Sequence, residues 1–355
     1  MATLRSLCSG FNAERYTAIR LAGAGAHEAP ATAHLNILCS SLAAAKPDLL
    51  LIGPLIPHAM AQLEAAYALH RYDLAADKEA LIAELAPCLT AIATRGDYPL
   101  PGELMRHFPR VKLIASSGTG YDGVDVDAAR ALGITVTNTP GPASECVADT
   151  AWALILATVR RTVFQDRYAR AGLWPRAPAP LTEKVWGERL GILGLGRIGR
   201  AIARRGEAFR MDIAYCGRRR QPDVAYRYYD DPVALARDVK ILVVAMPGRE
   251  ETRGFVDRHV IDALGPKGYF INVSRGTIVD EPYLVDALVH GRLAGAGLDV
   301  FANEPHIPQA LFALDNVVLQ PHTGSGSTQT RNAMGQMVVD NLVAYFAGKP
   351  LLSPI

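Results

Sequence analysis

Three polar side chains with complementary chemistry follow buried apolar runs in the second half of the chain. Arg275 closely follows YFINV, Glu304 lies in GLDVFANEP, and His322 closely follows VVLQ. A guanidinium can bind a carboxylate with its planar fork, an imidazole can deliver a proton near neutral pH, and a carboxylate can hold an imidazole by its second nitrogen. Ligands in open α/β sheets gather at the carboxyl ends of strands, so we expect these side chains to share one site.

A glycine-rich turn earlier in the chain indicates which cofactor such a site uses. Residues 189–193 read as a short buried strand, and Gly194, Gly196 and Gly199 then follow the pattern G-x-G-x-x-G. Apolar residues at helical intervals and a second strand over 211–216 come next. This order is the context of a dinucleotide site, because the glycines permit a tight turn, close approach to a pyrophosphate and close helix packing. The cofactor-binding residues predicted here are Gly194, Gly196, Arg197, Ile198 and Gly199.

The end of the second strand predicts which dinucleotide binds. A carboxylate for the ribose 2′-hydroxyl is expected about twenty residues after the first glycines. The chain instead has Arg218, Arg219 and Arg220 there, and no acid before Asp223. Guanidinium groups bind a 2′-phosphate bidentately, whereas a carboxylate repels it, so we predict NADP(H) in preference to NAD(H). The alternative is a solvated basic turn, because arginine runs are common on protein surfaces.

Strands and helices alternate from Lys46 to the C-terminus and form the framework that must position these residues. Expected strands cover residues 48–53, 89–94, 111–116, 134–137, 240–246, 269–273, 294–299 and 317–320. Expected helices cover residues 57–69, 102–107, 125–132, 143–161, 282–290 and 328–346, and a further helix contains Leu81 and Leu85. Such alternation favours an α/β fold in which helices cover both faces of parallel sheets.

These motifs and their separations resemble the signature of the D-isomer-specific 2-hydroxyacid dehydrogenases. The spacing is 29 residues from Arg275 to Glu304 and 18 from Glu304 to His322. GTGYDGVD resembles the family's substrate loop, TVTNTPG its hinge, and VADTAWAL its first cofactor-domain helix. The resemblance extends from about Lys46 to the C-terminus, and within the family it is closest to NADPH-dependent hydroxypyruvate/glyoxylate reductases and 2-ketogluconate reductases.

The resemblance implies reduction of a small 2-keto acid to the D-2-hydroxy acid, with Arg275, Glu304 and His322 as catalytic residues. Arg275 would bind the carboxylate and orient the ketone, and His322 would protonate the ketone oxygen as hydride arrives. Glu304 would hold the imidazole and favour its charged form. Reduction is the expected direction because cellular NADPH pools are usually kept reduced.

Further substrate contacts are expected from the other domain. Backbone N–H groups of Thr119 and Gly120 would bind the substrate carboxylate, in a cleft that closes on binding. Thr119 and Thr323 stand where the family often has an apolar residue, and their hydroxyls favour a polyhydroxylated or hydroxymethyl substrate. The predicted substrate-binding residues are Thr119, Gly120, Arg275, His322 and Ser325.

Three more residues are expected beside the cofactor, each with a structural alternative. Asp299 would hold the nicotinamide carboxamide, or else serve as a turn residue at the end of a strand. Thr150 would contact the pyrophosphate, or else have a structural role in its helix. Val273 would pack near the adenosine or the nicotinamide, or else belong to the core.

The resemblance also implies how the chain is divided. The predicted fold class is α/β with two doubly wound parallel-sheet domains. Residues 46–141 and 322–355 would form a flavodoxin-like substrate-binding domain, and residues 142–321 an inserted Rossmann NAD(P)-binding domain. Residues 1–45 are expected to be a disordered N-terminal extension, or the result of a start codon placed too early. The alternative is an organelle transit peptide, because this segment has three arginines and only two acids, and such peptides are rich in arginine and poor in acids.

The composition is that of an ordinary soluble globular protein. Of 355 residues, 50% are apolar and 20% are charged, with a net charge of +2. This charge does not imply a nucleic-acid partner, and no apolar run approaches the roughly twenty residues of a membrane helix. The five scattered cysteines lack a C-x-x-C pair, so we predict a reducing, cytoplasmic compartment and no metal site.

Two segments in the middle of the chain predict that the protein forms a homodimer. The apolar helix over 143–161 and the proline-rich loop over 171–180 suggest a subunit contact, with packing inside the chain as the alternative. Trp174 in that loop would reach the neighbouring subunit's site, as a tryptophan does in some relatives, or else pack within its own loop.

One alternative function uses the same fold. The family includes transcriptional corepressors that retain the three catalytic residue types, so the chain could be an NAD(P)-sensing, corepressor-like interaction protein. Such a protein should carry a peptide-binding groove on the first domain and show negligible turnover. An assay of 2-keto acid turnover separates the two functions.

Overall fold

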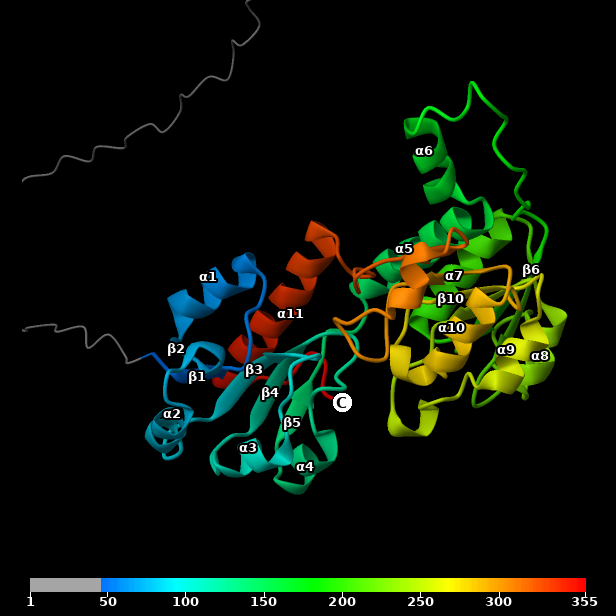
Figure 1. Ribbon diagram of the computed structural model, residues 1–355. Coiled ribbons are helices and arrows are strands. Elements are labelled where there is room, and N and C mark those ends of the chain that lie inside the picture. The colour runs from blue at the N-terminus through cyan, green and yellow to red at the C-terminus, as the bar shows by residue number, and fades with distance from the viewer. Residues whose placement is uncertain (1–45) are drawn as a thin grey trace, which may run out of the picture. The chain divides into compact units, whose positions relative to one another are not determined.

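The computed structural model describes residues 46–355, which form two sheets with helices on both faces (Figure 1). The expectations for residues 1–45 lie outside the described residues. Every ladder between named strands is parallel in both sheets, so the predicted α/β class is confirmed. Among the described helices, none combines the length and the apolar character needed to cross a bilayer.

The first sheet has five strands in the order β2-β1-β3-β4-β5. Its strands are β1 (Asp48–Leu51), β2 (Ala68–Arg71), β3 (Ala91–Arg95), β4 (Leu113–Ser117) and β5 (Thr135–Thr137). Its helices are α1 (Pro57–Ala66), α2 (Lys78–Leu85), α3 (Gly102–Arg106), α4 (Val126–Ala131) and the C-terminal α11 (Thr328–Phe346). One buried cluster packs α1 and α11 on one face, and another packs α2, α3 and α4 on the opposite face.

The expected helix over 57–69 is wrong at its end, because β2 begins where the helix was extended. Tyr67 takes an extended conformation, with φ of −127° and ψ of 156°, and closes α1. Ala68 then pairs with Asp48 and Leu69 with Leu49, so the segment adds an edge strand to β1. Ala68 and Leu69 are both apolar, so they fit the periodicity of a helix as well as that of a strand. Their pairing with β1 makes them a strand.

The second sheet has seven strands in the order β12-β11-β10-β9-β6-β7-β8. Its strands are β6 (Arg189–Leu193), β7 (Asp212–Cys216), β8 (Arg227–Tyr229), β9 (Ile241–Val244), β10 (Tyr269–Asn272), β11 (Gly295–Leu298) and β12 (Val317–Leu319). One face packs against α5 (Ala143–Val159) and α7 (Arg197–Ala208), and the other against α8 (Pro232–Asp238), α9 (Arg258–Leu264) and α10 (Glu281–Val289). Strand β8 and helices α8 and α9 have no counterpart among the elements expected from the sequence.

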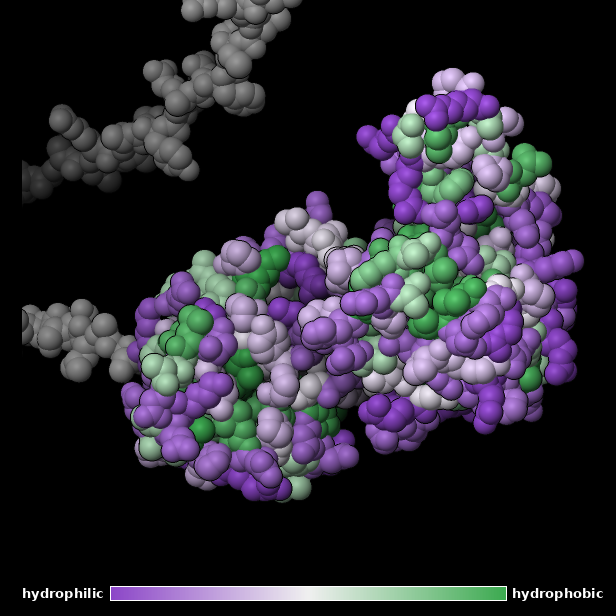
Figure 2. All heavy atoms as spheres, in the orientation of Figure 1, coloured by the Kyte–Doolittle hydropathy of each residue, from purple (hydrophilic) through white to green (hydrophobic). Residues whose placement is uncertain are grey.

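Helix α5 and the segment after it differ in burial. Ten residues of α5 are buried, including Trp152, whose indole N–H donates to Ile202 O, so this helix packs inside the chain. An unpredicted helix, α6 (Thr162–Arg170), follows and has no buried residue. Trp174 in the next loop is 74% exposed. The exposed apolar side chains in this part of the molecule therefore lie on α6 and the loop that follows it. Figure 1 locates this segment, and Figure 2 shows the same region in a space-filling view.

Candidate active site

Arg275 is held in a turn that directly follows the buried strand β10. The Asn272 side chain shapes this turn, because its Nδ2 donates to Arg275 O at 3.0 Å and its Oδ1 accepts from Ser274 N at 3.0 Å. The Ser274 hydroxyl donates to Met246 O in the loop after β9. The Arg275 side chain donates from Nε to Asp122 Oδ2 at 2.7 Å and from Nη1 to Ser274 O at 2.7 Å. The guanidinium is therefore fixed by its own turn and by an acid from the first sheet's loops.

The imidazole of His322 is joined to Glu304 by a hydrogen bond of 2.7 Å between Nδ1 and Oε2. The other oxygen of Glu304 accepts from Phe301 N at 3.0 Å. Burial raises the pKa of Glu304, but these two bonds and the charges of His322 and Arg275 outweigh it, so the pKa lies below its ordinary value. Glu304 is thus an ionised support for the imidazole at neutral pH, and it lies within the electrostatic reach of Arg275.

The backbone loop that carries His322 is anchored by Asp299 at the end of β11. Asp299 is 1% exposed, and its two carboxylate oxygens accept from Thr323 N at 2.7 Å and Gly324 N at 2.8 Å. Its carbonyl accepts from His322 N at 2.8 Å. His322 has φ of 52°, in the left-handed region that non-glycine residues rarely adopt. The three hydrogen bonds hold this strained backbone in place.

Thr150 and Asp299 both contact this loop. The Thr150 hydroxyl donates to Gly324 O at 3.2 Å, which links α5 to the loop of His322. Burial raises the pKa of Asp299, although its bonds from Thr323 and Gly324 act in the opposite direction. These contacts are structural, and the predicted contacts of both residues with the cofactor stay predictions.

The predicted carboxylate-binding loop lies directly against Arg275. A Cβ on Gly120 would lie 1.9 Å from Arg275 Nη2, so the guanidinium touches the backbone of this loop. The N–H groups of Thr119 and Gly120 donate to no group within residues 46–355. Thr119 O accepts from Asn138 Nδ2 at 2.9 Å, which fixes the peptide. Two backbone donors without a partner among the described residues therefore lie beside a guanidinium, and this combination suits an anion.

The glycine turn fits a dinucleotide pyrophosphate at each of its three positions. Gly194 has φ of +96°, and a Cβ there would meet the Met246 backbone at 2.8 Å. A Cβ on Gly199 would lie 2.1 Å from Gly194 O, so α7 packs closely against the turn. A Cβ on Gly196 would meet nothing within 4 Å, and no side chain caps α7 there. The open space and the uncapped helix N-terminus suit an anionic phosphate.

The arginines after β7 stand in the position expected for a 2′-phosphate. Arg218, Arg219 and Arg220 are exposed, and their side chains form no hydrogen bond or ion pair with the part of the chain that the structure describes. The first acid, Asp223, is bound by both terminal nitrogens of Arg200, at 2.8 and 3.0 Å. This ion pair offsets the negative charge of the carboxylate, so Asp223 repels a nearby phosphate less.

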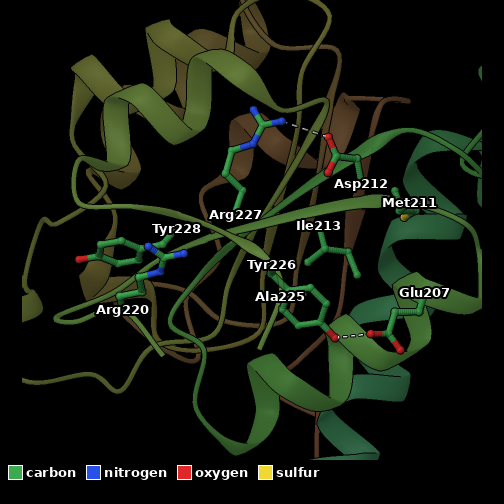
Figure 3. A pocket seen from close by; sticks show the side chains of 9 residues that line it. All are labelled: Glu207, Met211, Asp212, Ile213, Arg220, Ala225, Tyr226, Arg227 and Tyr228. Carbon is green, nitrogen blue, oxygen red and sulfur yellow. Dashed lines mark hydrogen bonds and ion pairs between the residues drawn. The ribbon is translucent and has the colours of Figure 1, made fainter. Parts of the chain in front are cut away.

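Arg220 differs from its two neighbours in where its side chain lies. It lines a surface pocket of about 640 Å³ together with Tyr226, Tyr228 and the amino-terminal end of β7 (Figure 3). The cofactor in an open α/β sheet lies at the opposite, carboxyl end of the strands. The geometry therefore supports Arg218 and Arg219 as the phosphate contacts more than Arg220.

The other predicted residues take less distinctive places. Val273 is 7% exposed and belongs to the cluster under α5 and α7. Arg197 is exposed at the first position of α7, Ile198 is half-buried beside it, and Ser325 is half-buried in the loop after His322. No group of three potential ligands among His, Cys, Asp and Glu is placed to hold a metal within the described residues.

Sequence reasoning missed several residues that position this site. Asp122 lies in the GTGYDGVD motif and Asn272 in the expected strand over 269–273, but neither was given a role. Arg200 had no role in the predictions, although its guanidinium pairs with Asp223, the first acid after β7. A polar residue directly before a functional arginine turn was a usable signal for Asn272, because such side chains bind neighbouring backbone groups. No local signal joins Asp122 to Arg275, which lies 153 positions away.

Comparison with known proteins decides the family. The sequence profile of the D-isomer specific 2-hydroxyacid dehydrogenase NAD binding domain matches residues 152–324. A glyoxylate/hydroxypyruvate reductase A of Arabidopsis thaliana is 46% identical over 306 residues, which cover 86% of this chain and 98% of that protein. The chain belongs to the D-isomer specific 2-hydroxyacid dehydrogenases. The predicted resemblance is thereby confirmed.

Other members of the 2-hydroxyacid dehydrogenases share the whole described fold. A 2-ketogluconate reductase of Gluconobacter oxydans is 41% identical over 310 residues, or 87% of this chain and 99% of that protein. The solved NADPH-dependent glyoxylate/hydroxypyruvate reductase of Sinorhizobium meliloti, in complex with NADP and malonate, has a TM-score of 0.81 and 43% identity. That match covers 88% of this chain and 97% of the other. This 2-hydroxyacid dehydrogenase therefore contains an NAD(P)-binding domain.

Proposed function

We propose that this 2-hydroxyacid dehydrogenase reduces small 2-keto acids to D-2-hydroxy acids with NADPH. The observation that carries the proposal is the His322–Glu304 hydrogen bond of 2.7 Å, formed within the electrostatic reach of Arg275. Arg275 and the N–H groups of Thr119 and Gly120 bind the carboxylate and present the ketone. His322 donates its proton to the ketone oxygen, and Glu304 stabilises the imidazolium before the transfer. The dinucleotide supplies the hydride.

The substrate class follows from the relatives and from the loop residues. Relatives named for glyoxylate/hydroxypyruvate and for 2-ketogluconate are 46% and 41% identical to this chain. The Thr119 hydroxyl is buried without a partner among the described residues. This threonine and Thr323 support a substrate that carries its own hydroxyl groups, such as hydroxypyruvate or 2-ketogluconate.

The preference for NADP(H) rests on the charge at the end of β7. Arg218 and Arg219 are exposed and unpaired within residues 46–355, and Asp223 pairs with Arg200. Two free guanidinium groups beside an acid whose charge is already offset suit a phosphate dianion. A solved relative named as NADPH-dependent, 43% identical, was crystallised with NADP.

The domain division, the homodimer and the cytoplasmic location belong to the same proposal. Residues 46–141 and 322–355 would bind the substrate, and residues 142–321 the dinucleotide. The exposed apolar side chains of α6 and its loop support an interface with a second copy, because monomers rarely expose so many large apolar groups together.

The decisive test is NADPH oxidation with glyoxylate, hydroxypyruvate and 2-ketogluconate. His322→Gln should lower kcat by roughly 100-fold or more, because a positioned proton donor contributes about that much. His58→Gln is the matched control, since His58 is an exposed histidine on α1. Unchanged turnover in His322→Gln would remove this histidine from the mechanism.

A corepressor-like function remains the second candidate because of one surface feature. A pocket of about 790 Å³ lies between α2 and α3, lined by Tyr72, Ile82 and Leu104 among others. Both helices pack on the first sheet, and a corepressor-like protein would need its peptide-binding groove in that part of the molecule. If the wild-type protein turns over none of the three keto acids with either cofactor, this candidate replaces the reductase.

A further inference from the structure

We propose that Asp122 is a positioning residue, which holds the Arg275 guanidinium in the orientation that binds the substrate carboxylate. The inference deepens the proposed function and rests on it only for the substrate class, a small 2-keto acid anion. Asp122 lies in the loop after β4, and Arg275 in the turn after β10, so the two come from different sheets.

The hydrogen bonds of Arg275 divide its guanidinium into a fixed part and an open part. Nε donates to Asp122 Oδ2 at 2.7 Å, and Nη1 donates to Ser274 O at 2.7 Å. A guanidinium has five N–H donors in a rigid plane. Three donors, on Nη1 and Nη2, are therefore left for a ligand. Asp122 sets the rotation of this plane, because it fixes the only N–H group on the stem side.

Two glycines make room for this arrangement. A Cβ on Gly248 would lie 2.5 Å from Arg275 Cγ and 3.3 Å from Asp122 Oδ1. A Cβ on Gly120 would lie 1.9 Å from Nη2 and 3.0 Å from Asp122 Oδ2. The ion pair is thus enclosed between two backbone segments that have no side chains. The open Nη2 end lies beside Gly120, where the free backbone donors are.

The exposure of the pair indicates what Asp122 contributes. The Asp122 and Arg275 side chains are 37% and 30% exposed, and ion pairs this open add little to folding stability. A carboxylate beside an anion site also repels the ligand, so Asp122 does not add affinity through its charge. Its effect is geometric: it removes the rotamers of Arg275 that would turn the open donors away from the substrate.

The test compares Asp122→Ala, Asp122→Asn and the control Asp127→Ala in the full-length chain. Asp127 is an exposed acid in the first turn of α4, five positions after Asp122, and it pairs with Arg130. Asp122→Ala should weaken malonate binding and lower kcat/KM for the keto acid by about tenfold, the equivalent of one ordered charged hydrogen bond. Asp122→Asn should stay within about threefold of the wild type because it keeps an acceptor oxygen. The KM for NADPH and the thermal midpoint should not change in any variant.

A double-mutant cycle identifies the partner of Asp122. In an Arg275→Ala background, Asp122→Ala should have no further effect on malonate binding, because the group that it orients is gone. Calorimetry with malonate measures binding at the anion site without turnover. A wild-type protein that binds malonate but reduces no keto acid would therefore contradict only the proposed function. Wild-type binding and turnover in Asp122→Ala, or an equal loss in the Arg275→Ala background, would overturn the role of Asp122. A wild type that neither binds malonate nor turns over a keto acid would overturn both.

Discussion

Glu304 is ionised in a partly buried place because its two oxygens have separate partners. Phe301 N and the His322 imidazole each donate to one oxygen. Burial alone raises the pKa of this carboxyl group, and the two bonds with the positive charges nearby bring it below its ordinary value of 4.5. The folded state therefore prefers the charged form. A carboxylate of this kind stabilises the protein above the pKa of the unfolded chain and loses that effect as the pH falls through the lower pKa of the folded state.

Glu304→Gln should therefore make stability less dependent on pH. At neutral pH we expect a smaller free energy of unfolding than in the wild type, because the charge-assisted bond to His322 is lost. The difference should shrink as the pH falls below 4.5 towards the lowered pKa of the folded state. Urea unfolding of both proteins across this range measures it. A difference that stays constant with pH would contradict the role given to the charge.

The arginines after β7 allow the cofactor preference to be tested at single residues. Arg218→Ala combined with Arg219→Ala should raise the KM for NADPH by roughly tenfold or more, because each phosphate contact is a charge-assisted bond. The KM for NADH should change little. Arg220→Ala is the matched control, since this side chain lines the pocket beside Tyr226. Equal losses for both cofactors would refute the assignment of these arginines to a phosphate.

Two glycines of the turn between β6 and α7 should have different roles: Gly199 in stability and Gly196 in cofactor binding. In Gly199→Ala the new methyl group would lie 2.1 Å from Gly194 O, so the helix must move away from the strand. We expect a loss of about 1–3 kcal/mol, typical of overpacking. In Gly196→Ala the methyl group meets nothing within 4 Å, so stability should hold while the KM for NADPH rises. Thermal unfolding and cofactor titration of both variants check the contrast, which equal melting temperatures would contradict.

Elements with a strong local pattern could be predicted from the sequence, and elements decided by neighbours could not. The strand over 189–193 and the helix over 328–346 match the structure, because each has apolar spacing and clear end signals. Ala68 and Leu69 were expected in a helix, because only pairing with β1 makes Ala68–Arg71 a strand. The same holds for the site. Motif spacing predicted Glu304 and His322, whereas the contact of Asp122 with Arg275 depends on how two sheets meet.

At the scale of the whole molecule, the exposed apolar side chains around α6 predict an oligomer. Trp174, Leu181 and Trp186 are 74%, 99% and 60% exposed, and α6 buries no residue of its own. The variant Trp174→Glu with Leu181→Glu should shift a homodimer to monomers, because two charges would have to lose water at the interface. Light scattering coupled to gel filtration reads the mass. A monomeric wild type would contradict the prediction.

The anchoring of the His322 loop on Asp299 makes the support of this loop sensitive to acid. Both oxygens of this carboxylate accept backbone N–H bonds, and burial raises its pKa above the ordinary range. When acid protonates it, the bonds from Thr323 N and Gly324 N weaken, whereas the bond from His322 N to the Asp299 carbonyl is kept. Because the pKa is raised, that protonation favours the folded chain and does not unfold it. In acid the loop that carries His322 should therefore loosen while the fold persists.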